Sequence, residues 1–137
     1  MLPDGGDDLA LRSLTPVLVT RDIPATINFL ESVFGFRVEA RADEFAWARL
    51  VRDNVRVMLT GPFDTEPDQR PQLTGSLYIE CDDVDAEWRA IAGRARVCFE
   101  PETLHYGMRE FGVHDNNGYL YVFATPAPST APSGSCD

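Results

Sequence analysis

The stretch LHYGMREFGVHDNNGYLYVF, residues 104–123, decides how the rest of this chain is interpreted. It contains two short strand-like segments on either side of Asn117-Gly118. Because this pair tolerates positive φ at both turn positions, the two segments are predicted to run antiparallel as a hairpin. Residues 105–108, HYGM, form an aromatic and flexible approach to the hairpin. We therefore predict that this stretch is one wall of a small-molecule site.

Working outward from the hairpin, the chain contains the same order of elements twice. The first unit is predicted to have a strand at 14–20, a helix at 23–34 and strands at 36–42, 45–51 and 55–60, and the second a strand at 76–81, a helix at 84–92, a strand at 95–99 and the hairpin. Short similar segments, RDI against DDV and VRDN against VHDN, recur about 60 residues apart and support a duplication. A sheet with a helix on one face needs cover for the other face. The predicted fold class is α+β, with two βαβββ modules forming a curved mixed sheet with a cleft.

The domain boundaries follow from composition. Residues 1–12 are predicted to be a flexible arm, 13–125 one domain with modules at about 13–61 and 75–125, and 126–137 a disordered Pro/Ser/Ala-rich tail. The proline-containing segment 61–74 is predicted to link the modules.

The charge balance excludes one class of partner. The chain of 137 residues carries 22 acidic and 12 basic residues, a net charge of -10, which disfavours nucleic-acid binding. The acidic charge is compatible with attraction of a cationic partner and equally with a role in solubility alone. Its 3 cysteines include no CxxC pair, and no signal peptide or long apolar run is found. We predict a cytoplasmic protein that does not contact membranes.

Several segments resemble a known family. They are PVLVTRDIPATINFLESVFGF at 16–36, VRDNVRVMLT at 51–60, DVDAEW at 83–88 and YGMREFGVHDNNGYLYVF at 106–123. Together with the duplicated βαβββ order, they resemble the glyoxalase I, bleomycin resistance and dioxygenase (vicinal oxygen chelate) superfamily, and most closely its bleomycin-resistance proteins. The likeness covers about 14–125, and the Gly-x-Arg-Glu-Phe element before an Asp-x-x-Gly turn is its most specific part. The resemblance implies a homodimer that sequesters a large cationic glycopeptide in grooves at its interface.

The resemblance also implies where a metal would be held. Enzymes of this superfamily place His, Gln or Glu ligands at four cleft-facing strand positions, which correspond here to Thr15, residues 58–60, Ser76 and Val122. None of these supplies an imidazole or a carboxylate. No Ser/His/Asp triad, phosphate loop or dinucleotide fingerprint is found either. We predict no metal, no cofactor, no catalytic residue and no enzymatic activity.

Five candidate ligand-binding residues come from the resemblance. Phe45 matches an aromatic that lies against the drug, and Tyr78 and Tyr106 stand where the drug-binding proteins tend to have tryptophan. Thr60 stands where a small hydroxyl occurs, and Glu39 stands where an acidic residue could pair with a cationic tail.

Five further candidates come from side-chain type. Trp47, Met58, Phe63 and Met108 are compatible with a cleft lined by aromatics and thioethers, and equally with a core. Glu110, with Arg109, is a candidate polar anchor for a ligand, or the two residues form a structural ion pair across strands.

The leading hypothesis is a metal-independent protein that sequesters a bleomycin-type antibiotic, or a similar cationic and planar molecule, in a dimer-interface cleft and so confers resistance. One alternative is a metal-dependent lyase or extradiol dioxygenase of the same superfamily, with its metal site at other positions. Another is a self-associating or regulatory module whose cleft is filled by its own side chains.

Overall fold

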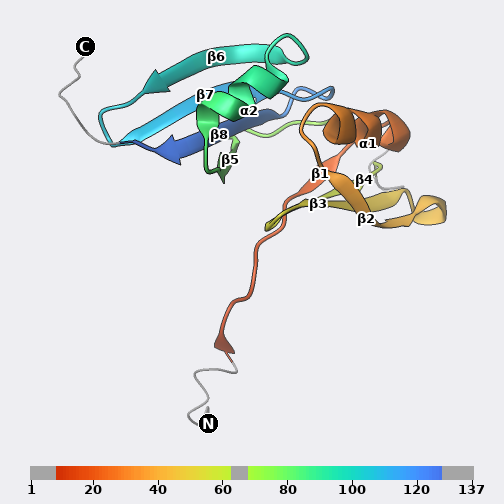
Figure 1. The fold of residues 1–137 in the computed structure, drawn as a ribbon. Helices are drawn as coiled ribbons and strands as arrows, with labels where there is room; N and C mark the ends of the chain where they lie inside the picture. Colours follow the sequence, from red (N-terminus) through yellow and green to blue (C-terminus); the bar gives the residue numbers. More distant parts are fainter. Residues whose placement is uncertain (1–8, 63–67, 128–137) are drawn as a thin grey trace.

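The computed structural model describes residues 9–62 and 68–127, which form two four-stranded sheets with one helix each (Figure 1). Sheet A contains β1 (Val17–Val19), β2 (Arg37–Ala42), β3 (Trp47–Arg52) and β4 (Val55–Thr60) in the order β1-β4-β3-β2, with helix α1 (Ile23–Ser32). Sheet B contains β5 (Leu77–Glu80), β6 (Arg96–Thr103), β7 (Met108–His114) and β8 (Leu120–Pro126) in the order β5-β8-β7-β6, with helix α2 (Val84–Ile91). In each sheet the first strand pairs in parallel with the last, and the other pairs are antiparallel. The predicted α+β fold class with a repeated βαβββ order is confirmed.

Both helices begin at an aspartate whose side chain caps the first turn. Asp22 accepts a hydrogen bond from the backbone N–H of Ala25 at 3.0 Å, and Asp83 accepts one from Ala86 at 3.1 Å. Each carboxylate satisfies a backbone donor that has no partner within the helix, so the cap defines where each helix starts.

The core is shared by the two modules. Strand alternation buries the residues that face the helices, and Phe34, which follows α1, lies between the sheets. Its ring centroid is 4.8 Å from that of Tyr121 and 5.5 Å from that of Phe123, both on β8. Because this ring contacts sheet B from the end of a sheet A helix, the modules form one continuous hydrophobic core.

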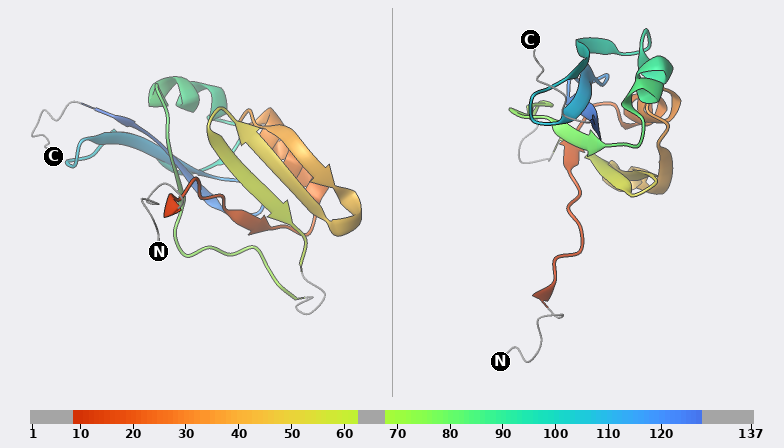
Figure 2. Two further views of the ribbon diagram at one scale, coloured as in Figure 1. Left: turned by 90° about the horizontal axis from the view of Figure 1, so that it is seen from below. Right: turned by 60° about the vertical axis from the view of Figure 1, so that its left-hand side comes forward.

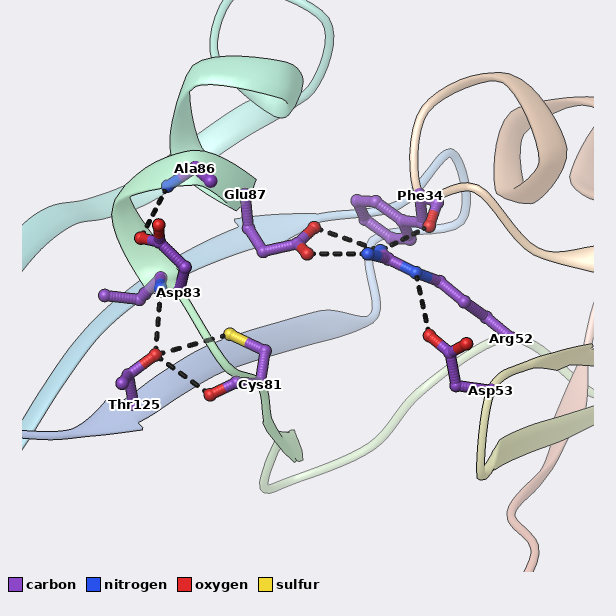
Figure 3. A network of polar contacts seen from close by, with 9 residues as sticks. Phe34, Arg52, Asp53, Cys81, Asp83, Ala86, Glu87 and Thr125 are labelled. Atoms are coloured by element: carbon purple, nitrogen blue, oxygen red, sulfur yellow. Dashed lines mark hydrogen bonds and ion pairs between the residues drawn. The ribbon is translucent and has the colours of Figure 1, made fainter.

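An ion pair supports the same junction (Figure 3). Arg52 at the end of β3 donates from Nη1 and Nη2 to the two carboxylate oxygens of Glu87 on α2, at 3.0 and 2.6 Å, and from Nη1 to the carbonyl of Phe34 at 3.0 Å. The bidentate geometry orients α2 relative to sheet A.

The β7–β8 turn also joins the modules, through contacts to α1 and β1. Asn117 Nδ2 donates to the hydroxyl of Thr26 at 2.9 Å, and the Tyr119 hydroxyl donates to the carbonyl of Val19 at 2.9 Å. The hairpin identified from the sequence is therefore part of the junction between the two units.

The conformation of this turn depends on Asp115. The predicted antiparallel hairpin is confirmed by the pairing of β7 with β8, but only Gly118, with a φ of 91°, uses the positive φ that the pair tolerates, since Asn117 is not among the described residues with positive φ. The reason is Asp115, whose side chain accepts hydrogen bonds from the N–H groups of Asn117 and Tyr119 at 2.8 and 3.0 Å. These bonds hold a turn that needs a left-handed residue only at its last position.

The predicted strand over 45–51 is wrong at its start. Asp43–Phe45 form one turn of 3-10 helix, η2, and Ala46 has a φ of 49°. A left-handed residue breaks the two-residue alternation, so Phe45 does not continue the face of Trp47. Phe45 lies instead at the tip of the β2–β3 hairpin and is 75% exposed.

Strand β6 is longer than predicted and extends to Thr103 past Pro101. A proline is compatible with this position because β6 is at the edge of sheet B, where a missing N–H costs no ladder hydrogen bond. The predicted flexible arm and tail lie mostly outside the described residues, and so does Phe63. No helix in the described ranges is long and apolar enough to cross a membrane.

Candidate functional site

Each sheet packs on its helix with one face, whereas no helix of the described chain covers its other face, which we call the open face (Figure 2). On sheet B, Phe111 lies under Trp88 of α2, with ring centroids 5.2 Å apart, so its neighbours Glu110 and Gly112 point to the open face. Strand pairing arranges the open face in rows across the sheet. One row is Tyr78, Val122, Gly112 and Phe99, and the next is Glu80, Ala124, Glu110 and Glu102, in the order β5, β8, β7, β6.

Three of the predicted ligand-binding residues meet on this face. The Tyr78 hydroxyl donates to Glu110 Oε2 at 2.6 Å, and the Tyr106 hydroxyl donates to Glu110 Oε1 at 3.0 Å. Glu110 is only 6% exposed, whereas Tyr78 and Tyr106 are 51% and 56% exposed. The carboxylate is thus enclosed by two phenols whose rings reach solvent.

The electrostatics of this group favour the observed hydrogen bonds. The pKa values of the Tyr78 and Tyr106 hydroxyls are raised, mainly by desolvation and next by the hydrogen bond to the Glu110 carboxylate. Both hydroxyls therefore remain proton donors. None of the ion pairs within residues 9–62 and 68–127 involves Glu110, Glu80 or Glu102. These three carboxylates on the open face of sheet B therefore have no ion-pair partner in the described part of the chain.

The open face of sheet A has a different character. Glu39 accepts hydrogen bonds from Arg49 at 2.8 Å and from Arg56 at 2.9 and 3.0 Å, and these hydrogen bonds lower the pKa of Glu39 to about 2. The Arg49 guanidinium lies 5.6 Å from the centroid of the Trp47 ring, a cation–π distance. Two arginines against one carboxylate leave this group with a net positive charge.

The remaining candidates are divided between the two faces. Trp47 is directly opposite Thr60, and Arg49 is opposite Met58, so Trp47, Met58 and Thr60 share the open face of sheet A. Met108 is on β7 at the same alternation as Glu110, on sheet B. Glu39 already has two arginine partners within the chain, so the expected pairing with a cationic tail would compete with them.

The alternative role of Glu110, an ion pair with its sequence neighbour, is wrong. Arg109 points to the opposite face of the strand and donates to Asp85 of α2 at distances from 3.0 to 3.2 Å. Sequence reasoning did not find Phe99, Glu80 or Glu102 as parts of the face. The alternation of side chains along β5 and β6 shows which face of the sheet these residues occupy only once the strand register is known.

The four positions implied for metal ligands do not fit a divalent cation. Val122 lies on the open face next to Tyr78 and Gly112, is 5% exposed and offers no donor atom. Among the described residues, no three or more His, Cys, Asp or Glu side chains gather as metal ligands would. No chemistry is therefore assigned to a metal at these positions.

A separate pocket of about 360 Å³ lies at the module junction, and none of the ten candidates lines it. Two of its lining residues, Arg52 and Glu87, form the ion pair that Figure 3 shows. We assign this pocket a structural role in holding the modules together.

Comparison with known proteins agrees with this geometry. Residues 12–123 match the family model described as Glyoxalase/Bleomycin resistance protein/Dioxygenase superfamily. No curated protein matches the sequence.

Solved structures of low sequence identity share the fold. A bleomycin resistance determinant encoded on the transposon Tn5 is 22% identical, with a TM-score of 0.67, over 85% of this chain and 98% of that chain. TioX from Micromonospora sp. ML1 is 23% identical, with a TM-score of 0.68, over 85% and 99%. A superfamily member from Sphaerobacter thermophilus DSM 20745 is 14% identical, with a TM-score of 0.74, over 85% and 98%. Since the family model spans most of the sequence, the chain belongs to the Glyoxalase/Bleomycin resistance protein/Dioxygenase superfamily.

Proposed function

We propose that this protein binds and sequesters a small molecule that combines a cationic group with a planar group, of the bleomycin type, and performs no chemistry on it. The observation that carries the proposal is Glu110, a nearly buried carboxylate without a cationic partner in the described chain, enclosed by two half-exposed tyrosines. The superfamily contains both enzymes and binding proteins, so membership alone does not decide between them.

Burial of the Glu110 carboxylate, which is 6% exposed, has a cost in free energy. A carboxylate removed from water is destabilised unless hydrogen bonds and an opposite charge compensate it. Tyr78 and Tyr106 supply the hydrogen bonds, and a bound cation would supply the charge. The exposed tyrosine rings would add cation–π attraction and a surface for stacking.

A homodimer would complete the site. The contacts that join the two sheets within one chain involve the helices and turns, which leaves both open faces available. The face of sheet A has a surplus of arginine, and the face of sheet B carries Glu80, Glu102 and Glu110. Sheet A of one copy placed opposite sheet B of another would bring unlike charges together and form two equivalent clefts.

The alternative function, a metal-dependent lyase or dioxygenase, finds no support in the side chains at the four expected ligand positions, and among the described residues no three or more His, Cys, Asp or Glu side chains gather to form a metal site at other positions. The donor atoms that such an enzyme needs are missing from them.

The test is a fluorescence titration of the protein with bleomycin. Saturable quenching is expected, and Tyr106→Ala should weaken it, whereas Leu73→Ala, a change of an exposed residue outside both sheets, should not. A lack of quenching, together with no survival advantage for cells that express the protein, would exclude this drug as the ligand. Stoichiometric zinc, nickel, manganese or iron in the purified protein would overturn the assignment of binding without a metal.

A further inference from the structure

We propose that Phe99 is a stacking surface for the planar group of the ligand, and that Gly112 positions its ring. This inference rests on the proposed function, because it concerns the same open face of sheet B. Phe99 was not among the residues expected from the sequence.

The geometry places the Phe99 ring directly on the backbone of Gly112. Phe99 on β6 pairs with Gly112 on β7, and a Cβ built at residue 112 would lie 2.5 Å from Cε1 and 2.9 Å from Cδ1 of the ring. Real Cβ contacts are longer, so any other residue at 112 would displace the ring. Gly112 does not have positive φ, so the backbone conformation does not require glycine here. The requirement is space, the usual reason for a glycine inside a strand that another group approaches closely.

The ring lies at one end of a row that includes a predicted site residue. Phe99, Gly112, Val122 and Tyr78 follow one another across the four strands. The rings of Phe99 and Tyr78 lie at the two ends of the row, with Gly112 and Val122 between them. Val122 lies between the two rings and is 5% exposed. A planar group could stack on this surface.

The adjacent row determines what kind of planar group fits. Glu80, Glu110 and Glu102 lie one row away on the same face. A ligand that stacks on Phe99 would thus have its substituents next to carboxylates. The chemical class favoured by this arrangement is a flat aromatic ring system that carries a positive charge.

Two sets of variants test the inference, with proflavine, a planar aromatic cation, as the probe. Phe99→Leu should weaken proflavine binding about 2- to 12-fold, the range expected for loss of one aromatic contact, and Phe99→Tyr should retain the wild-type affinity. Gly112→Ala should weaken binding in the wild-type background, because the methyl group lifts the ring, and should have no further effect in the Phe99→Ala background. Unfolding measured for the same variants checks the contact itself, since Gly112→Ala should destabilise only the protein that keeps the ring.

The outcomes separate this inference from the drug assignment. Binding of proflavine that depends on Phe99, without binding of bleomycin, would support the inference and exclude the drug. Equal affinity of the wild type and Phe99→Leu, or no binding of proflavine to the wild type, would overturn the inference. Additive effects of Gly112→Ala and Phe99→Ala on affinity would overturn the positioning role of Gly112.

Discussion

Replacing Glu110 by glutamine removes the charge of the proposed anchor and keeps its shape. The glutamine amide still accepts a hydrogen bond from one tyrosine, and its amino group can donate to the hydroxyl oxygen of the other. Loss of a buried charge raises the free energy of unfolding, whereas the weaker hydrogen bonds to Tyr78 and Tyr106 lower it. We expect the free energy of unfolding to change by no more than about 1 kcal/mol.

The effect on ligand binding should be much larger. A cation about 4 Å from a carboxylate gains about 4 kcal/mol at the effective dielectric constant of a protein surface. Desolvation of the ligand cation and screening beside the half-exposed tyrosines reduce this gain to about 1–3 kcal/mol. Glu110→Gln should therefore raise the Kd for bleomycin by about 5- to 150-fold.

Calorimetric titration at low and at moderate salt measures this effect, with Glu31→Gln as the matched control. Glu31 is an exposed residue of α1, and its substitution removes the same net charge far from the open face of sheet B. A general electrostatic attraction would respond equally to both variants and would weaken with salt. Equal Kd values for Glu110→Gln and Glu31→Gln would refute the assignment of Glu110 as the anchor.

Three further predictions concern stability and titration. Phe34→Ala should lower the free energy of unfolding by about 3–5 kcal/mol in a denaturant titration, because the ring is buried between the sheets; a loss below about 1 kcal/mol would contradict the shared core. All 4 tyrosines have a raised pKa, so tyrosinate absorbance of the folded protein should develop only above pH 10, and stability should fall as the pH rises past 10, where the unfolded chain loses its protons first. Tyrosinate half-developed at pH 10 in the folded state would contradict the raised pKa of the tyrosine hydroxyls. The lowered pKa of Glu39 means that its contribution to stability is present above pH 4.5 and is lost as the pH falls towards 2, so the stability difference between the wild type and Glu39→Gln should shrink over that interval, and a constant difference would count against the ion pairs.

Much of the fold could be predicted because its signals act over a few residues. Asp22 and Asp83 bond N–H groups three residues away, and alternation identifies strands without knowledge of their partners. An error occurred where a single left-handed residue overrides the pattern. Ala46 interrupts the predicted strand at its start, whereas Asp115 selects a hairpin turn in which Gly118 alone of the Asn117-Gly118 pair has positive φ.

The candidate site was predictable only in part. Residue type and family resemblance identified Tyr78, Tyr106 and Glu110, which the structure brings together. The same reasoning included Phe45, which lies at an exposed hairpin tip, and omitted Phe99. Nothing local distinguishes an aromatic that lies on the open face from one at the end of a hairpin.

The two βαβββ units, the aspartates at which the helices begin and the net charge of -10 could all be recognised in the sequence. The tertiary structure decided which side chains meet. Tyr78 and Glu110 are 32 residues apart, and Phe99 contacts Gly112 only through the register of β6 on β7. Register depends on long-range pairing and packing, so no local pattern contains it. Because of this register, the segment 104–123 does more than form a hairpin with aromatic neighbours. Its Glu110 carboxylate accepts hydrogen bonds from Tyr78 and Tyr106 on the open face of sheet B.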